Sequence, residues 1–283
     1  MVYAYKDYRD IPPILESEQV KVLIDRILRS QTLGGTPQLE WIMHKDILEK
    51  LLEIHRSKCA YCEQKIAISN SSVFLTYYRP YSHYYWLAYE WSNMLPVCKA
   101  CYLYTEHDFP VENELHHRVN FPPKSRQDWL PNGIPFLKEK PLLLNPEMDK
   151  PEKYLIFNPE GYLEAIDQNS RATNTIEAYQ LNKGQVVVAR KNKIEDFFTR
   201  FEKAIMTFKR FDADNSPSQK AMDEYFIPIL EDLVVMSNPE AEFSLLGKSM
   251  LYNFDTFFSD RLYKPKDRKI LRNAYQIFMK DKF

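Results

Sequence analysis

The sequence is poor in glycine, in cysteine and in long apolar runs, and each shortage excludes a class of protein. Six glycines among 283 residues exclude a collagen-like repeat. Four cysteines are too few for a small scaffold held together by disulfides. No apolar run approaches the ~20 residues that a membrane-spanning helix needs, and the opening residues MVYAYKDYRDIPP lack the apolar stretch of a signal peptide. We therefore expect a soluble, cytoplasmic protein, without a membrane partner, whose cysteines stay reduced.

The chain also lacks an excess of charge of either sign. Its 38 lysines and arginines oppose 39 aspartates and glutamates, which leaves a net charge of -1. Binding of nucleic acid by counterion release needs many cations close together. Any hold on nucleic acid must therefore come from a local patch or from a partner.

Apolar residues recur with helical periodicity toward both ends of the chain, whereas the middle is rich in proline. Apolar residues recur at helical spacing in 16–30 and in 37–57. The pattern is helical again from about residue 170, where an apolar stripe is formed by Ile194, Phe198, Phe201, Ile205 and Phe208. Eight prolines in 111–165 predict a long, irregular connection. These patterns favour an α+β fold that is mostly helical.

All four cysteines lie in two C-x2-C pairs, Cys59 with Cys62 and Cys98 with Cys101. Two such pairs supply four thiolates in a tetrahedron, which is typical of a structural zinc site. A thioredoxin-like redox centre would need only one pair beside a βαβ unit, and no such unit is apparent. We predict that the four cysteines bind a structural Zn²⁺, and that function lies in the 35 residues between the pairs.

Four segments follow from these observations. They are an N-terminal helical segment (1–55), a zinc-knuckle module (56–115), a proline-rich wrapping connection (116–169) and a C-terminal helical domain (170–283).

The middle of the chain also carries a series of recognisable motifs. Nine of the 19 tyrosines lie within residues 61–104. In order along the chain come KCAYCE (58–63), Arg79-Pro80, YYWLAYEWSN (84–93), Phe109-Pro110, LLLNPEMDKPEKYLIFNPEG (142–161) and RATNTIEAYQLN (171–182). With these motifs, residues 56–195 resemble the HNH-type endonuclease family of the Septu and retron anti-phage systems, the PtuB-like proteins.

The resemblance implies a ββα-metal module within 56–115 and a place in a bacterial anti-phage complex. It also implies a partner, an ABC/SMC-like ATPase of the PtuA kind. The protein would then bind nucleic acid as part of that complex. An active site of this family would add Mg²⁺ or Mn²⁺ to the structural zinc.

The family motif has a general-base histidine just before the Arg-Pro pair, where it takes a proton from the attacking water. Here Thr76 and Tyr77 stand at those positions. An unperturbed phenol titrates near ~10 and an imidazole near ~6.5, so Tyr77 is a poor base at neutral pH. Asn93 matches the asparagine that orients the base, and Tyr102 stands where the family carries another asparagine. The resemblance therefore implies a degenerate HNH site.

Other side chains could still serve such a site. His83, six residues beyond Tyr77, and His107, near the second cysteine pair, are candidate substitute bases or metal ligands, and each is also explained as a surface or loop histidine. Arg79 could hold a phosphate with its bidentate fork or brace the fold by pairing with Glu90. Lys99 is the second cation that could contact nucleic acid.

Three hypotheses about function remain open at the level of sequence. The first is a zinc-binding HNH-fold subunit of an anti-phage complex that has lost its own hydrolytic site, a pseudo-nuclease. The second is an active metal-dependent endonuclease that cleaves phage or host nucleic acid with a substitute base. The third is a zinc-binding interaction module without catalysis. The crowded tyrosines suit either base stacking or a protein interface.

Overall fold

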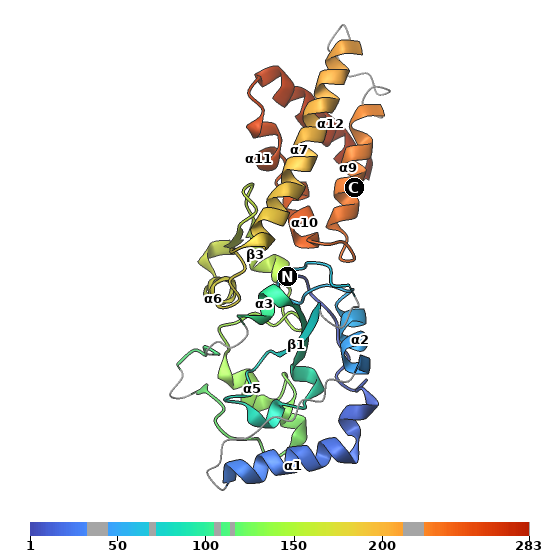
Figure 1. Cartoon of the computed structure of the whole chain (residues 1–283). Helices are drawn as coiled ribbons and strands as arrows, with labels where there is room; N and C mark the ends of the chain where they lie inside the picture. The colour runs from blue at the N-terminus through green and yellow to red at the C-terminus, as the bar shows by residue number, and fades with distance from the viewer. Residues whose placement is uncertain (33–44, 68–71, 105–108, 114–116, 212–223, 283) are drawn as a thin grey trace. The chain divides into compact units, whose positions relative to one another are not determined.

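The computed structural model describes residues 1–32, 45–67, 72–104, 109–113, 117–211 and 224–282. These residues form a mostly helical α+β fold with two small sheets, which confirms the predicted class (Figure 1). They divide into two compact units. Unit 1 comprises Met1–Tyr154 and Ala165–Leu181, and unit 2 comprises Leu155–Glu164 and Asn182–Phe283. The four domain limits expected from the sequence stay predictions.

Unit 1 is built around an antiparallel hairpin. Its strands are β1 (Val73–Tyr77) and β2 (Met94–Cys98), and Val73 lies opposite Cys98. The short helix α3 (Lys99–Tyr102) follows β2 directly. The order of elements is therefore strand, long loop, strand, helix.

Helices on the N-terminal side precede the hairpin, and the last of them packs on it. They are η1 (Pro13–Glu16), α1 (Glu18–Thr32) and α2 (Lys45–Ile54). Apolar side chains of α2 pack against β1, β2 and the turn before β2, in a core of Leu15, Ile47, Leu51, Leu75, Trp91 and Met94. The part of the predicted 37–57 helix that precedes Lys45 lies outside the described residues. Burial of this apolar face fixes α2 on the hairpin, at roughly 25 cal/mol for each Å² removed from water.

The remaining described elements of unit 1 are short, as the prolines of the connection predict. They are η2 (Tyr85–Leu87), η3 (Trp91–Asn93), η4 (Arg126–Trp129), α5 (Ile134–Glu139), η5 (Pro151–Lys153), η6 (Ile166–Gln168) and α6 (Ser170–Ala178). Asn169 caps α6 by accepting a hydrogen bond from the backbone N–H of Ala172.

The other small sheet joins β3 (Leu155–Phe157) to β4 (Leu163–Ala165).

Unit 2 is helical beyond its strands. Its helices are α7 (Gln185–Phe211), α9 (Ile227–Ser237), α10 (Ser244–Tyr252), α11 (Phe254–Phe257), η7 (Ser259–Arg261) and α12 (Pro265–Lys282). Of the predicted apolar stripe on α7, Ile194, Phe201, Ile205 and Phe208 are buried. Phe198 is half-buried, and the guanidinium of Arg261 lies 4.0 Å from the centre of its ring. None of the described helices is long and apolar enough to cross a membrane.

Candidate metal centre and its surroundings

The structure brings the four predicted cysteine ligands together. Their Sγ atoms all lie within 4.8 Å of one another, and those of Cys62 and Cys98 are 3.6 Å apart. Four sulfurs at ~2.3 Å from one zinc ion would be about 3.8 Å apart along the edges of a tetrahedron. Cys59, Cys62 and Cys101 are buried and Cys98 is half-buried. The cluster could therefore hold one tetrahedral metal ion shielded from water.

Local backbone hydrogen bonds shape the first cysteine pair into a tight turn. The N–H of Cys59 donates to the carbonyl of Gln64 at 2.9 Å, and the N–H of Glu63 donates to the carbonyl of Cys59 at 3.2 Å. Glu63 takes the left-handed conformation, with φ of 65°, to close the turn. A further bond from the N–H of Ala60 to the carbonyl of Pro96, 3.0 Å, ties the turn to β2. The first pair thus faces the second.

The second pair depends on the junction between β2 and α3. Cys98 is the last residue of β2 and the N-cap of α3, and Cys101 lies within that helix. A spacing of three residues places two side chains on the same face of a helical turn. Hydrogen bonds from the neighbouring thiols, that of Cys101 foremost, lower the pKa of Cys98. This favours the thiolate, which is the form that binds metal.

A residue far along the chain secures the first pair. The buried ring of Tyr61 stacks on Tyr179, which follows α6, with ring centres 3.6 Å apart. The hydroxyl of Tyr61 donates to that of Tyr179 at 2.7 Å. The KCAYCE motif therefore packs against the RATNTIEAYQLN motif, which explains why both sequences belong to one structural unit.

Tyr77, which the resemblance to the HNH family suggested for the general-base position, is the last residue of β1. Its half-buried ring meets Tyr81 edge-on, with ring centres 6.2 Å apart. Burial raises the pKa of Tyr77, and the nearby hydroxyls of Tyr89, Tyr81 and Tyr102 raise it further. The phenol is therefore protonated at neutral pH and does not act as a base there. Thr76 beside it is buried.

Asn93 clamps the loop between the strands. Its Oδ1 accepts from the N–H of Arg79 at 2.8 Å, and its Nδ2 donates to the carbonyl of Arg79 at 2.9 Å. Nδ2 also donates to the carbonyl of Leu87 at 3.4 Å. Both ends of the buried amide are engaged with backbone, so Asn93 positions the loop that follows β1.

Arg79 is a bracing residue in this structure. Its side chain is 3% exposed, and its Nε donates to Oε2 of Glu139 at 2.8 Å. The guanidinium carbon lies 4.1 Å from the ring centre of Phe136. Glu139 also accepts from the hydroxyl of Tyr84 at 2.6 Å. The carboxylate that braces Arg79 is thus Glu139 instead of the expected Glu90, because the chain folds α5 back onto the loop after β1.

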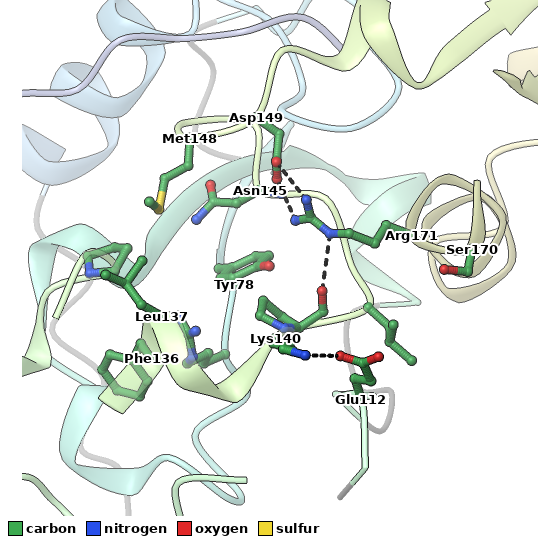
Figure 2. Close-up of a pocket in the computed structure, with 14 residues that line it drawn as sticks. Tyr78, Glu112, Phe136, Leu137, Lys140, Asn145, Met148, Asp149, Ser170 and Arg171 are labelled. Atoms are coloured by element: carbon green, nitrogen blue, oxygen red, sulfur yellow. Dashed lines mark hydrogen bonds and ion pairs between the residues drawn. The ribbon is translucent and has the colours of Figure 1, made fainter. Parts of the chain in front are cut away.

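A pocket of about 420 Å³ adjoins Arg79 (Figure 2). Figure 2 shows the carboxylate of Asp149 facing the guanidinium of Arg171, and two hydrogen bonds of 2.8 and 2.7 Å join them. At the same pocket Lys140 pairs with Glu112 at 2.8 Å. These charges are satisfied within the protein. The Asp149–Arg171 pair also joins the two downstream motifs, since Asp149 belongs to the first and Arg171 to the second.

The other predicted site residues do not gather at Tyr77 in the described structure. His83 is exposed, and its Nδ1 lies 3.3 Å from Oγ of Ser82. Lys99 is exposed at the start of α3. His107 lies outside the described residues.

One buried polar cluster has no counterpart in the sequence-based expectations. Oε1 of Glu147 lies 3.2 Å from Nζ of Lys6 and 3.2 Å from Nε2 of His55. Lys6 also donates to the carbonyl of Met94 at 2.8 Å and lies 3.9 Å from the ring centre of Trp91. Burial lowers the pKa of His55. Glu147 lies inside the LLLNPEMDKPEKYLIFNPEG motif, which is the signal that could have pointed to this cluster.

Comparison with known proteins gives relatives that carry the name Septu. No family model matches the chain. It is 28% identical over 166 residues to Septu protein PtuB of Bacillus mycoides (strain KBAB4), covering 54% of this chain and 51% of that protein. It is 21% identical over 272 residues to Septu protein PtuB of Bacillus thuringiensis, covering 93% and 90% of the two chains.

A third relative carries a different name. The chain is 25% identical over 165 residues to Septu protein PtuA of Bacillus mycoides (strain KBAB4), covering 53% of this chain and 21% of that protein. The matched part of the chain thus spans about half of the first PtuB relative and about a fifth of PtuA. From its similarity to two proteins of that name, the chain is a homologue of the Septu PtuB proteins.

Proposed function

We propose that the chain is a zinc-binding, PtuB-like subunit of an anti-phage defence complex that works with a PtuA-like partner. Relatives that carry the names Septu protein PtuB and Septu protein PtuA support the defence role and the partner. The resemblance to the HNH family supports an ABC/SMC-like ATPase as that partner.

The proposed zinc site is the four-cysteine cluster. Soft thiolates in a closed tetrahedral arrangement suit Zn²⁺ better than Mg²⁺ or Ca²⁺, which prefer oxygen ligands. The two cysteine pairs flank a hairpin that leads into α3, and this order supports an HNH-like ββα module within 56–115. A structural zinc ion at this place would contribute directly to the folding free energy of the module.

We further propose that this subunit does not hydrolyse phosphodiesters with its own residues. The observation that carries this proposal is the half-buried phenol of Tyr77, with its raised pKa, at the end of β1, where the resemblance puts the family's base. Asn93 is engaged with backbone, and Arg79 is paired with Glu139. Glu90 is the single acidic residue of segment 64–105, so few oxygen ligands are at hand for Mg²⁺.

The test is to purify the chain together with a PtuA-like protein and to assay cleavage of phage and host nucleic acid with Mg²⁺ or Mn²⁺. Tyr77→Phe removes the hydroxyl and keeps the ring, so it serves as the sharp variant. We expect this variant to leave zinc content, assembly and any cleavage by the complex unchanged. Loss of cleavage in Tyr77→Phe, or in His83→Ala with zinc retained, would establish a catalytic site in this chain and overturn the pseudo-nuclease proposal.

The partner assignment is tested separately. We expect the two gene products to co-purify in a fixed ratio. Two products that elute apart, both folded and at matched concentrations, would contradict the assignment of a PtuA-like partner.

A further inference from the structure

The end of α7 and the start of α12, both in unit 2, bring a group of cations close together. Nζ of Lys209, in the last turn of α7, lies 2.7 Å from Oδ1 of Asp267, in the first turn of α12. This ion pair fixes the end of α7 beside the start of α12. We call the area the α7–α12 surface and define it by Lys209, Arg210, Tyr263, Lys264, Lys266 and Lys269.

The α7–α12 surface has far more positive than negative charge. Of its five cations, Lys209 alone has an acidic partner among the described residues, and that partner is Asp267. The other four are exposed: Arg210, Lys264, Lys266 and Lys269. Among the described residues, the carboxylates of Asp255 and Asp260 are bound to Arg272. A chain with a net charge of -1 thus concentrates cations here.

An aromatic ring stands beside these cations in full contact with water. Tyr263 is 93% exposed and lies directly before Lys264. The apolar area of its ring stays in water, so the ring contributes little to the stability of the fold. Exposed rings next to cations are the combination with which proteins bind single-stranded nucleic acid, because bases stack on the ring and phosphates meet the cations.

We propose that the α7–α12 surface binds single-stranded nucleic acid, with Tyr263 stacked on a base and the neighbouring cations on the phosphates. One exposed ring beside several cations suits one stacked base and the phosphates on either side of it. A lipid surface would call for several apolar side chains that enter the acyl boundary, whereas this surface offers one tyrosine among five cations. The proposal depends neither on the zinc site nor on the defence complex.

The test measures binding of a short fluorescein-labelled single-stranded oligonucleotide to the full chain by anisotropy, across a salt titration and without added divalent ions. Lys264→Ala, Lys266→Ala and Lys269→Ala together should reduce the slope of log K against log salt by about 2, at ~0.7 for each lost phosphate contact. Tyr263→Ala should weaken binding roughly 5- to 150-fold, the loss of one stacked base, and leave the slope unchanged.

A matched control comes from the same part of the chain. Lys183, Lys193 and Lys280 are exposed. At 1.5 Å per residue, Lys193 lies about 24 Å along α7 from Lys209, and Lys280 lies about 17 Å along α12 from Lys269. Their triple alanine variant should bind like the wild type. An equal loss in both triple variants, or no loss in either the lysine variant or Tyr263→Ala, overturns the proposal.

Vesicles of phosphatidylcholine with phosphatidylserine test whether the surface binds an anionic membrane instead of nucleic acid. We expect the oligonucleotide to bind at salt concentrations where the vesicles do not. Binding to the vesicles alone, lost in the Lys264/Lys266/Lys269 variant, would assign the surface to a membrane and overturn the proposal. Circular dichroism checks that the variants fold.

Discussion

At the scale of single residues, the structure replaces an expected role with a different one. The sequence offered Arg79 as a phosphate ligand or as a partner of Glu90, and the structure pairs it with the buried Glu139. A buried carboxylate that keeps its charge needs partners, and Glu139 has Arg79, Tyr84 and the N–H of Val119. This arrangement gives Arg79 a structural reason to be present without any contact to nucleic acid.

The Arg79–Glu139 pair leads to a first prediction about stability. Glu139→Gln keeps the shape of the side chain but leaves the buried guanidinium without its counter-charge, which should cost about 3–5 kcal/mol of unfolding free energy. Arg79→Met combined with Glu139→Gln should recover part of that loss. Urea unfolding measures both. Glu112→Gln, in the exposed pair with Lys140, is the control and should leave the urea midpoint nearly unchanged. Equal midpoints for Glu139→Gln and the wild type would refute the bracing role.

His55 leads to a second prediction at this scale, on pH dependence. Burial lowers the pKa of His55 in the folded state, while the unfolded chain takes up a proton near ~6.5. The unfolded state therefore binds more protons as the pH falls from about 7 to about 5, so stability falls over that range. His55→Gln should show a shallower fall in unfolding free energy than the wild type. Parallel pH profiles for the two proteins would contradict the lowered pKa.

At the scale of elements, the hairpin and α3 form a frame for the cysteine cluster. The C-x2-C spacing predicted that the two cysteines of each pair lie side by side, since three residues make one helical turn or one tight turn. Pro228 lies in the first turn of α9, where a missing N–H costs little.

Metal removal tests this frame. Cys98→Ser, or treatment of the wild type with a zinc chelator, should release one zinc ion per chain. It should also unfold the hairpin with α3, because the three buried thiols of the site would lose the metal ion that they bind. Metal analysis and near-ultraviolet circular dichroism follow the two events. Properly reduced protein that contains no zinc, yet folds, would show that the cysteines pack without a metal.

At the scale of the whole molecule, the two units have separate cores. Unit 2 has a phenylalanine core in which Phe201 meets Phe254 and Phe258 edge-on, at ring-centre distances of 5.4 and 5.0 Å. The cysteine cluster belongs to unit 1. Each unit therefore has its own apolar core, and unit 1 has the proposed metal in addition.

This division predicts the pattern of hydrogen exchange after metal removal. Amides of β1, β2 and α3 should lose protection when zinc is chelated, because their packing depends on the cluster. Amides of α7 and α10 should keep their protection, because their core contains no metal ligand among the described residues. Mass spectrometry of exchanged peptides resolves the two groups. Equal loss of protection in both units would show that the chain unfolds as one cooperative body.

The sequence by itself determined the features that depend on neighbours a few residues apart. These are the mostly helical character and the two cysteine pairs. Tertiary structure alone decided which distant groups meet. It joined Arg79 to Glu139, Tyr61 to Tyr179, and Lys209 to Asp267. The physical reason is that helical and turn periodicities are set by local backbone geometry, whereas the partner of a buried charge or ring depends on the path of the whole chain.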